Sequence, residues 1–263
     1  MTTSRSRFFC IVGLVFAIVC IAACAAAPRP GIAPLPAILR VGVCSNSPPM
    51  IFKQDDGTYA GVEADLAREF AASFGKKVYF VECGWTDLIP ALLEKRIDII
   101  MSGMTVTTSR SVRVAFTDSY MLSGQIGLAT NANALRISGV NSLLIASIRI
   151  GMEKGTTGEI VSEKFFTRAK KVSYANPVQG VQAVLKDRID LFVHDAPVVW
   201  WFASLYESQG LTALPFFITQ ENIAWAMRKD DAQLLSGANR FIATWNNDGR
   251  LKSLLQRWLP KMI

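Results

Sequence analysis

Histidine and paired cysteines are scarce in this sequence, and these absences exclude several classes of enzyme. The 263 residues contain one His and five Cys, and no two Cys have the C-x-x-C spacing, which removes most zinc sites. The single His194 is followed directly by Asp195, an arrangement that argues against a Ser-His-Asp triad. No G-x-x-x-x-G-K-[ST] motif occurs, so the chain is not a P-loop nucleotide hydrolase. We therefore expect neither a metal ion nor a cofactor, and we assign no catalytic residues.

Charged residues are also few. They make up 19% of the chain against 51% hydrophobic residues, a balance that excludes a disordered protein and fits one or two domains with full cores. Lys and Arg number 28 against 21 Asp and Glu, but this excess is spread along the chain without a cluster. Nucleic acid is therefore not expected as a partner.

The N-terminus has the pattern of an export signal. Arg5 and Arg7 precede an uncharged run at 8–23, whose 16 residues fall short of the about 20 that a helix needs to span a bilayer. The run ends in Ile21-Ala22-Ala23-Cys24, which resembles a bacterial lipoprotein signal, so that residues 1–23 would be removed and Cys24 would carry the lipid. The alternative is an uncleaved N-terminal anchor. In either case the rest of the chain lies outside the cytoplasm, held to a membrane.

Residues 24–38 are interpreted as a linker. The stretch after Cys24 contains four prolines and no pattern of core-facing residues, which is typical of a semi-extended tether. Beyond it only Cys44 and Cys83 remain, each at the end of a short apolar run. Either they form a disulfide in an oxidising compartment, or both are small buried hydrophobic side chains. The sequence leaves both alternatives open.

From residue 39 onward, short β-type runs alternate with helical stripes. Val62, Leu66, Phe70 and Phe74 recur every four residues, as on one face of a helix, and Gly75 ends that helix. This β-α-β-α-β order predicts an α/β protein whose sheets are flanked by helices. The predicted strands, with helices between them and two more helices at the C-terminus, are 39–43, 78–81, 97–101, 147–152, 172–174, 191–193 and 222–227.

The loops that follow the strands carry the candidate binding residues, because ligands of open α/β sheets bind outside the carboxyl ends of the strands. After the third predicted strand come Gly103, Thr105 and Arg110, which offer close backbone approach, a hydroxyl and a planar fork for a carboxylate. After the fourth, Thr156 and Thr157 open a helix whose free N–H groups favour an anion. Both loops are therefore suited to a negatively charged group.

Asp195 follows the sixth predicted strand and is suited to an ammonium group. Together with the two anion-favouring loops it predicts a zwitterion, an α-amino acid, as the ligand. Each residue also has an ordinary structural alternative. Asp195, two residues before Pro197, is a natural helix N-cap, and either threonine of the second loop is another. Arg110 also fits a solvated surface, and Trp85 fits the core at the start of a helix.

Several stretches, taken in order, resemble the family-3 extracellular solute-binding proteins, which capture polar amino acids for ABC importers. The resemblance implies the type II periplasmic-binding-protein fold, with two lobes of parallel or mixed sheets flanked by helices and joined by a two-strand hinge. The matching stretches, with Arg110 between the third and the fourth, are 59–66 (YAGVEADL), 85–92 (WTDLIPAL), 98–105 (DIIMSGMT), 116–120 (FTDSY), 155–159 (GTTGE) and 194–198 (HDAPV).

The resemblance also implies boundaries for the two lobes. Lobe 1 would comprise residues 39–127 and 221–263, and lobe 2 would comprise residues 128–220. The chain would cross between them near 127–130 and again near 218–222. Because the C-terminal segment returns to the first lobe, that lobe is expected to be discontinuous in sequence.

Residue roles follow from the same resemblance. Arg110 would clamp the ligand's α-carboxylate, helped by the backbone and hydroxyl groups of Thr105 and Thr157. The carbonyl of Gly103 and the carboxylate of Asp195 would hold the α-ammonium group.

The sequence departs from the family at the end of the pocket that faces the ligand's side chain. Where many members carry an Asp, this chain has Cys44, and where many carry an aromatic residue it has Ser47. Only Trp85 is left to cover the ligand's side chain, so we expect a more open or more polar pocket. Glu153 falls where some relatives contact the ligand's tail, and a carboxylate there suits a cationic ligand such as arginine or lysine. Alternatively, Glu153 pairs with Lys154 or faces solvent.

The resemblance implies a monomeric, lipid-anchored periplasmic or extracytoplasmic protein that binds a polar amino acid, with a basic one as the more specific expectation. It would deliver the amino acid to the permease of an ABC transporter. One alternative is an enzyme on the same scaffold, similar to cyclohexadienyl dehydratases. The resemblance to these enzymes implies a carboxylate shortly after the position of Asp195, where this chain has Ala196, Pro197 and Val198. Another alternative is a ligand-sensing partner of a membrane receptor.

Overall fold

The computed structural model describes residues 38–260, all of which fall within one compact unit, residues 36–263. The predicted signal, Cys24 and nearly all of the tether lie outside the described residues. The tether was predicted one residue too long, because Ile38 already belongs to the first strand. Among the described helices, none has the length and apolar character needed to cross a membrane.

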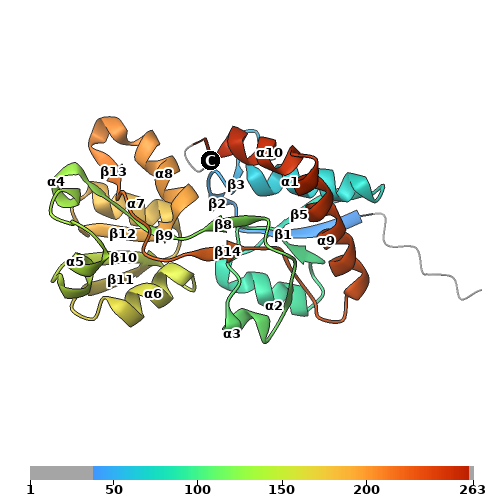
Figure 1. The fold of residues 1–263 in the computed structure, drawn as a ribbon, viewed down its shortest axis with the longest axis horizontal. Helices are drawn as coiled ribbons and strands as arrows, with labels where there is room; N and C mark the ends of the chain where they lie inside the picture. Colours follow the sequence, from blue (N-terminus) through green and yellow to red (C-terminus); the bar gives the residue numbers. More distant parts are fainter. Residues whose placement is uncertain (1–37, 261–263) are drawn as a thin grey trace, which may run out of the picture. The chain divides into compact units, whose positions relative to one another are not determined.

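The first sheet has five strands in the order β5-β1-β6-β15-β7 (Figure 1). Strand β1 is parallel to both of its neighbours, whereas β15 is antiparallel to β6 and β7, so the sheet is mixed, as predicted. A helical stripe with a four-residue spacing packs on it, and that helix ends at Ser73, before Gly75 with a φ of 66°. The strands are β1 (Ile38–Val43), β5 (Lys77–Glu82), β6 (Ile99–Ile100), β7 (Ala115–Phe116) and β15 (Ala226–Met227), and the helices are α1 (Val62–Ser73), α2 (Leu88–Leu93), α3 (Thr108–Ser111), α9 (Ala232–Asn247) and α10 (Arg250–Trp258).

The second sheet also has five strands, in the order β11-β10-β12-β9-β13. Strand β10 is parallel to β11 and β12, and β9 runs antiparallel to its two neighbours. The strands are β9 (Gln125–Thr130), β10 (Arg149–Glu153), β11 (Lys170–Tyr174), β12 (Leu191–Asp195) and β13 (Leu211–Ala213), and the helices are α4 (Asn131–Ala134), α5 (Val140–Ile145), α6 (Thr157–Phe165), α7 (Pro177–Leu185) and α8 (Ala196–Leu205). Each sheet with its helices is called a lobe below, lobe 1 for the first sheet and lobe 2 for the second.

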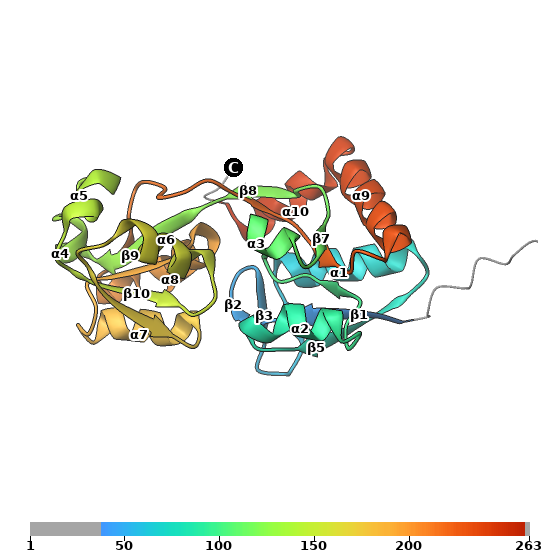
Figure 2. The same cartoon turned by 90° about the horizontal axis from the view of Figure 1, so that it is seen from below.

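Two antiparallel strands, β8 (Met121–Ser123) and β14 (Glu221–Ile223), run between the sheets (Figures 1 and 2). The second predicted crossing, 218–222, overlaps β14. The first prediction, 127–130, was wrong, because those residues lie in β9 and pair with β12 and β13. The apolar run from 126 to 129 lies wholly within β9, and Gly124 separates β9 from the crossing strand β8.

The predicted strand at 222–227 is divided in two. Its first part is β14, which pairs with β8, and its second part is β15, which pairs with β6 and β7. A small three-stranded sheet next to lobe 1 contains Ser47 in its first strand and consists of β2 (Asn46–Ser47), β3 (Ile51–Lys53) and β4 (Tyr59–Ala60).

The two cysteines near the first sheet are both free, so the disulfide alternative is not realised. Cys44 is buried and packs in one hydrophobic cluster with Leu88 and Ile97, and Cys83 lies at the edge of the same cluster. Burial raises the pKa of the Cys44 thiol to about 12. The second alternative, a small buried hydrophobic side chain, describes Cys44, whereas Cys83 is only partly buried.

Candidate functional site

A small cavity lies where the carboxyl ends of strands from both sheets face each other. Its volume is about 20 Å³, room for about one water molecule, so an amino acid can enter only if the surrounding residues move apart. Six of the predicted site residues line it, together with residues of both crossing strands. The six are Ser47, Trp85, Gly103, Glu153, Thr156 and Asp195.

Arg110 lies beside this cavity on the short helix α3 and is only 8% exposed. Its guanidinium donates to the main-chain oxygen of Thr105 at 2.8 Å and to that of Gly155, in lobe 2, at 3.2 Å. It also lies over the ring of Trp85, 5.3 Å from the ring centroid. No carboxylate of the described residues comes within ion-pair distance of Arg110, although a buried cation is ordinarily paired. Its remaining N–H groups are therefore suited to an anionic ligand.

Asp195 ends strand β12 and immediately precedes helix α8. Its side chain makes no capping hydrogen bond, so the carboxylate does not act as the N-cap of helix α8. It accepts instead from the side-chain amide of Gln125 at 2.7 Å. Burial raises the pKa of Asp195 to about 6, against the opposing effect of His194. Above that pH a carboxylate on the cavity wall faces the buried cation of lobe 1.

Glu153 ends strand β10 and is 2% exposed. One of its oxygens bonds to Nε2 of His194 at 2.8 Å, so Glu153 pairs with neither Lys154 nor solvent. Nδ1 of His194 accepts from the main-chain N–H of Asp195, a pattern that requires the neutral imidazole to donate from Nε2. The other carboxylate oxygen, Oε1, has no hydrogen-bond partner in the described part of the chain.

The pKa of His194 has two opposing influences. Burial lowers it, but the hydrogen bond to Glu153 and the negative charge of Asp195 raise it, and the net shift is upward. Above that pKa the neutral form described here applies. His194 was not predicted as a site residue, although it belongs to the matching stretch 194–198, and its pairing with Glu153 was missed.

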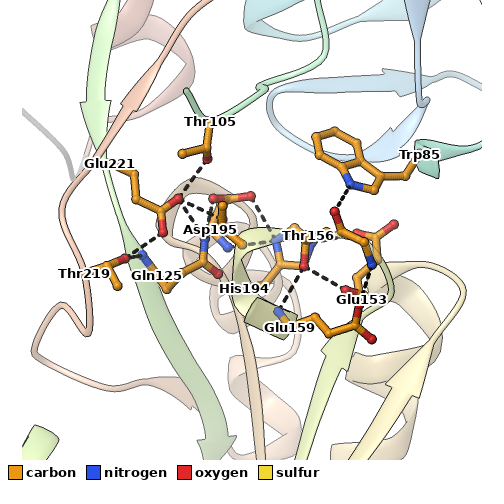
Figure 3. A network of polar contacts seen from close by, with 12 residues as sticks. Trp85, Thr105, Gln125, Glu153, Thr156, Glu159, His194, Asp195, Thr219 and Glu221 are labelled. Carbon is orange, nitrogen blue, oxygen red and sulfur yellow. Dashed lines mark hydrogen bonds and ion pairs between the residues drawn. The ribbon is translucent and has the colours of Figure 1, made fainter. Parts of the chain in front are cut away.

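A second missed residue is Glu221, a buried carboxylate at the start of crossing strand β14 (Figure 3). The hydroxyls of Thr105 and Thr157 each donate to its Oε2 at 2.8 Å, and the amide of Gln125 lies 3.3 Å from the same oxygen. The hydroxyl of Thr219 donates to Oε1 at 2.8 Å. The two threonines expected to help hold a ligand carboxylate thus contact a carboxylate of the protein itself. An acidic residue inside a predicted crossing was the one available signal.

Three predicted residues make hydrogen bonds to other parts of the protein itself. The hydroxyl of Thr156 caps helix α6 by accepting from the N–H of Glu159, so its structural alternative is correct. Gly103 adopts a φ of 68°, and its N–H donates to Glu63 at 2.6 Å. Trp85 donates from Nε1 to the main-chain oxygen of Gly155 at 2.9 Å, a contact between the lobes.

Glu63 supports the cavity wall from within lobe 1. It is completely buried on α1 and accepts from the N–H of Gly103, the hydroxyl of Tyr120 and the indole N–H of Trp225. Burial raises its pKa to about 7, although all three hydrogen bonds act in the opposite direction. The carboxyl group fixes the loop that carries Gly103, which no local sequence pattern had suggested. No group of His, Cys, Asp or Glu between residues 38 and 260 is arranged to hold a metal ion.

Comparison with known proteins gives matches along nearly the whole described chain. A family model described as bacterial extracellular solute-binding proteins, family 3, matches residues 39–261. The L-cystine-binding protein TcyJ of Escherichia coli K12 is 26% identical over 220 residues, covering 84% of this chain and 82% of TcyJ. The cyclohexadienyl dehydratase of Pseudomonas aeruginosa is 23% identical over 230 residues, covering 84% and 82%.

A solved structure with the same fold comes from Wolinella succinogenes. It is a candidate binding component of an ABC transporter, determined in complex with lysine. The structures superpose with a TM-score of 0.82 and 31% sequence identity, covering 87% of this chain and 98% of that one. The two-lobed type II fold predicted from the sequence is thereby confirmed.

Proposed function

Because the chain belongs to the bacterial extracellular solute-binding proteins, family 3, we propose that it captures an amino acid between its lobes and delivers it to the permease of an ABC importer. One observation carries the proposal. Asp195 lines the cavity from lobe 2, and Arg110, buried and without a carboxylate partner among the described residues, lies over the ring of Trp85, which lines the same cavity from lobe 1. A cation and a carboxylate in these places match the two charged ends of an α-amino acid.

A basic side chain suits the rest of the cavity. Oε1 of Glu153 is buried and lacks a donor in the described structure, and a buried acceptor in this condition costs about 1–3 kcal/mol. A guanidinium or ammonium group on the ligand would supply the donor and offset the charge. The relative from Wolinella succinogenes, solved with lysine, is consistent with a ligand of this class. We therefore propose arginine or lysine as the ligand class.

The working cycle requires hinge motion, since the cavity is too small for an amino acid as it stands. Opening would occur about β8 and β14, and a ligand that contacts both lobes would favour closure. The N-terminal signal pattern and Cys24 support an anchored protein outside the cytoplasm, and we propose that it acts there as a monomer. A permease would then recognise the two lobes in their closed arrangement.

Isothermal titration calorimetry of the purified protein tests this proposal, with arginine, lysine, glutamine, cystine and prephenate as ligands. Arg110→Lys keeps the charge but loses the planar fork, and Asp195→Asn keeps the size but loses the charge. Each should weaken arginine binding by about 10- to 100-fold. Arg113→Lys, an exposed change in the same segment, is the matched control. Equal weakening by all three changes would contradict the clamp.

The same titration separates binding from catalysis. A binding protein returns its ligand unchanged, whereas an enzyme consumes it, and mass spectrometry of the sample after incubation distinguishes the two. Binding of prephenate alone, with loss of prephenate over time, would replace the transport proposal by an activity like that of the Pseudomonas relative. The residues after Asp195 carry no carboxylate over the next three positions, which supports binding without turnover.

A further inference from the structure

We propose that Glu221 is an internal carboxylate that holds the lobes closed and competes with the ligand's carboxylate for the same hydroxyl groups. The competition with a ligand rests on the proposed function. The closure of the lobes is argued from the contacts of Glu221 alone. The residue would thereby set how tightly an amino acid binds.

The hydroxyl protons of Thr105 and Thr157 are both engaged in hydrogen bonds to Glu221. A threonine hydroxyl has a single proton to donate. The proton of Thr105 is directed to Glu221 at 2.8 Å, and that of Thr157 is directed to the same oxygen at 2.8 Å. Thr157 also accepts from the amide of Gln125 at 2.9 Å, which fixes the direction of its hydroxyl. Neither hydroxyl can donate to a ligand carboxylate until Glu221 releases it.

The same contacts join the two lobes. Thr105 follows strand β6 of lobe 1, and Thr157 begins helix α6 of lobe 2. Glu221 itself lies on β14, between the lobes, and is held there by Thr219. Any motion that separates the lobes must therefore break the bond from Thr105 or the bond from Thr157. Hydrogen bonds to a charged acceptor are the stronger kind, so this network opposes opening.

Competition follows from closure. A free protein closed on Glu221 cannot bind until it opens, so the apparent affinity is the intrinsic affinity reduced by the fraction that is open. If about nine-tenths of the free protein is closed in this way, removing the closure tightens binding by about tenfold. Repulsion between Glu221 and the incoming carboxylate acts in the same direction.

The test compares Glu221→Gln with the unmodified protein by small-angle X-ray scattering and by arginine titration. The substitution keeps the size of the side chain and removes its charge. We expect a larger radius of gyration without arginine and arginine binding about tenfold tighter. Glu207→Gln, the same change at an exposed position of lobe 2, should alter neither value. Unchanged or weaker arginine binding by Glu221→Gln would overturn the proposed competition.

A second variant protects the test against misfolding. Thr105→Val combined with Thr157→Val removes the two donors and leaves Glu221 in place. This protein should also have a larger radius of gyration without arginine, but it should not bind arginine more tightly, since the ligand would use the same hydroxyls. An unchanged radius would overturn the closure. If no protein binds any amino acid, the proposed function fails, while the scattering result still decides whether Glu221 closes the lobes.

Discussion

Glu63 makes the stability of lobe 1 depend on pH. Its carboxyl group is completely buried, and its pKa is raised from 4.5 to about 7, with burial as the largest cause. A raised pKa in an acid means that the folded protein holds the proton where the unfolded chain has lost it. Stability from this group is therefore present below about pH 4.5 and is lost as the pH rises to about 7. The shift corresponds to about 3 kcal/mol of unfolding free energy.

Glu63→Gln isolates this effect, because glutamine does not ionise. At pH 5 the variant should be less stable than the unmodified protein by about 1–3 kcal/mol. The reason is that the N–H₂ of glutamine would face one of the three groups that now donate hydrogen bonds to Glu63. Between pH 5 and pH 8 the difference should shift by about 3 kcal/mol in favour of the variant.

Urea denaturation at pH 5, 6, 7 and 8 measures both proteins. Glu69→Gln, an exposed change on the same helix, is the control and should follow the unmodified protein at every pH. Asp195 and His194 also have raised pKa values, and they lower the stability of all three proteins over the same interval. The comparison of variant with unmodified protein removes their contribution. Parallel curves for Glu63→Gln and the unmodified protein would refute a buried, pH-dependent carboxyl group.

Three further predictions concern the binding site. The pKa of Asp195 is about 6, and only its ionised form pairs with an ammonium group. Arginine affinity measured by calorimetry should therefore fall as the pH drops from 7 to 5. In Asp195→Asn the affinity should stay constant over the same pH range. Glu153→Gln should weaken lysine and arginine binding by about tenfold while changing glutamine binding little, as competitive titration would show; equal losses for all three would argue against contact with the ligand's tail. Trp85→Phe removes the bond to the main chain of Gly155, so the free protein should open more, measured as a larger radius of gyration, with no change in the melting temperature of more than a few degrees.

Local sequence patterns predicted the elements that carry their own signal. The stripe of Val62, Leu66 and Phe70 gave α1 because a four-residue spacing places these side chains on one helix face. Arg110 and Asp195 were identified from their positions after strands, and the structure places Asp195 on the cavity wall and Arg110 over Trp85, another wall residue. The first crossing was misplaced because an apolar strand reads the same whether it pairs inside a sheet or between lobes.

The missed residues share a physical reason. Glu63, Gln125 and Glu221 are buried polar groups whose partners lie far away in the sequence, as in the 116 positions between Thr105 and Glu221. A buried acidic residue requires hydrogen-bond donors, but the sequence around it does not identify the residues that supply them. Which donor supplies the hydrogen bond depends on the fold. The resemblance assigned both threonines to the ligand, because family-level patterns do not include Glu221.

The balance of charge around the cavity decides between a neutral and a basic ligand. Among the described residues, the carboxylates of Glu153 and Asp195 line the cavity, Glu221 is buried on the adjoining crossing strand, and Arg110 is the buried cation over Trp85. A neutral zwitterion would leave that excess of negative charge in place, whereas a basic amino acid reduces it, and charges in a closed cleft interact more strongly than in water. Arginine and lysine should therefore bind more tightly than glutamine. Added salt should reduce this difference in affinity and leave the affinity for glutamine unchanged. The reverse order would mean that Glu153 turns away from the ligand when the lobes reclose, or that a protonated His194 compensates its charge.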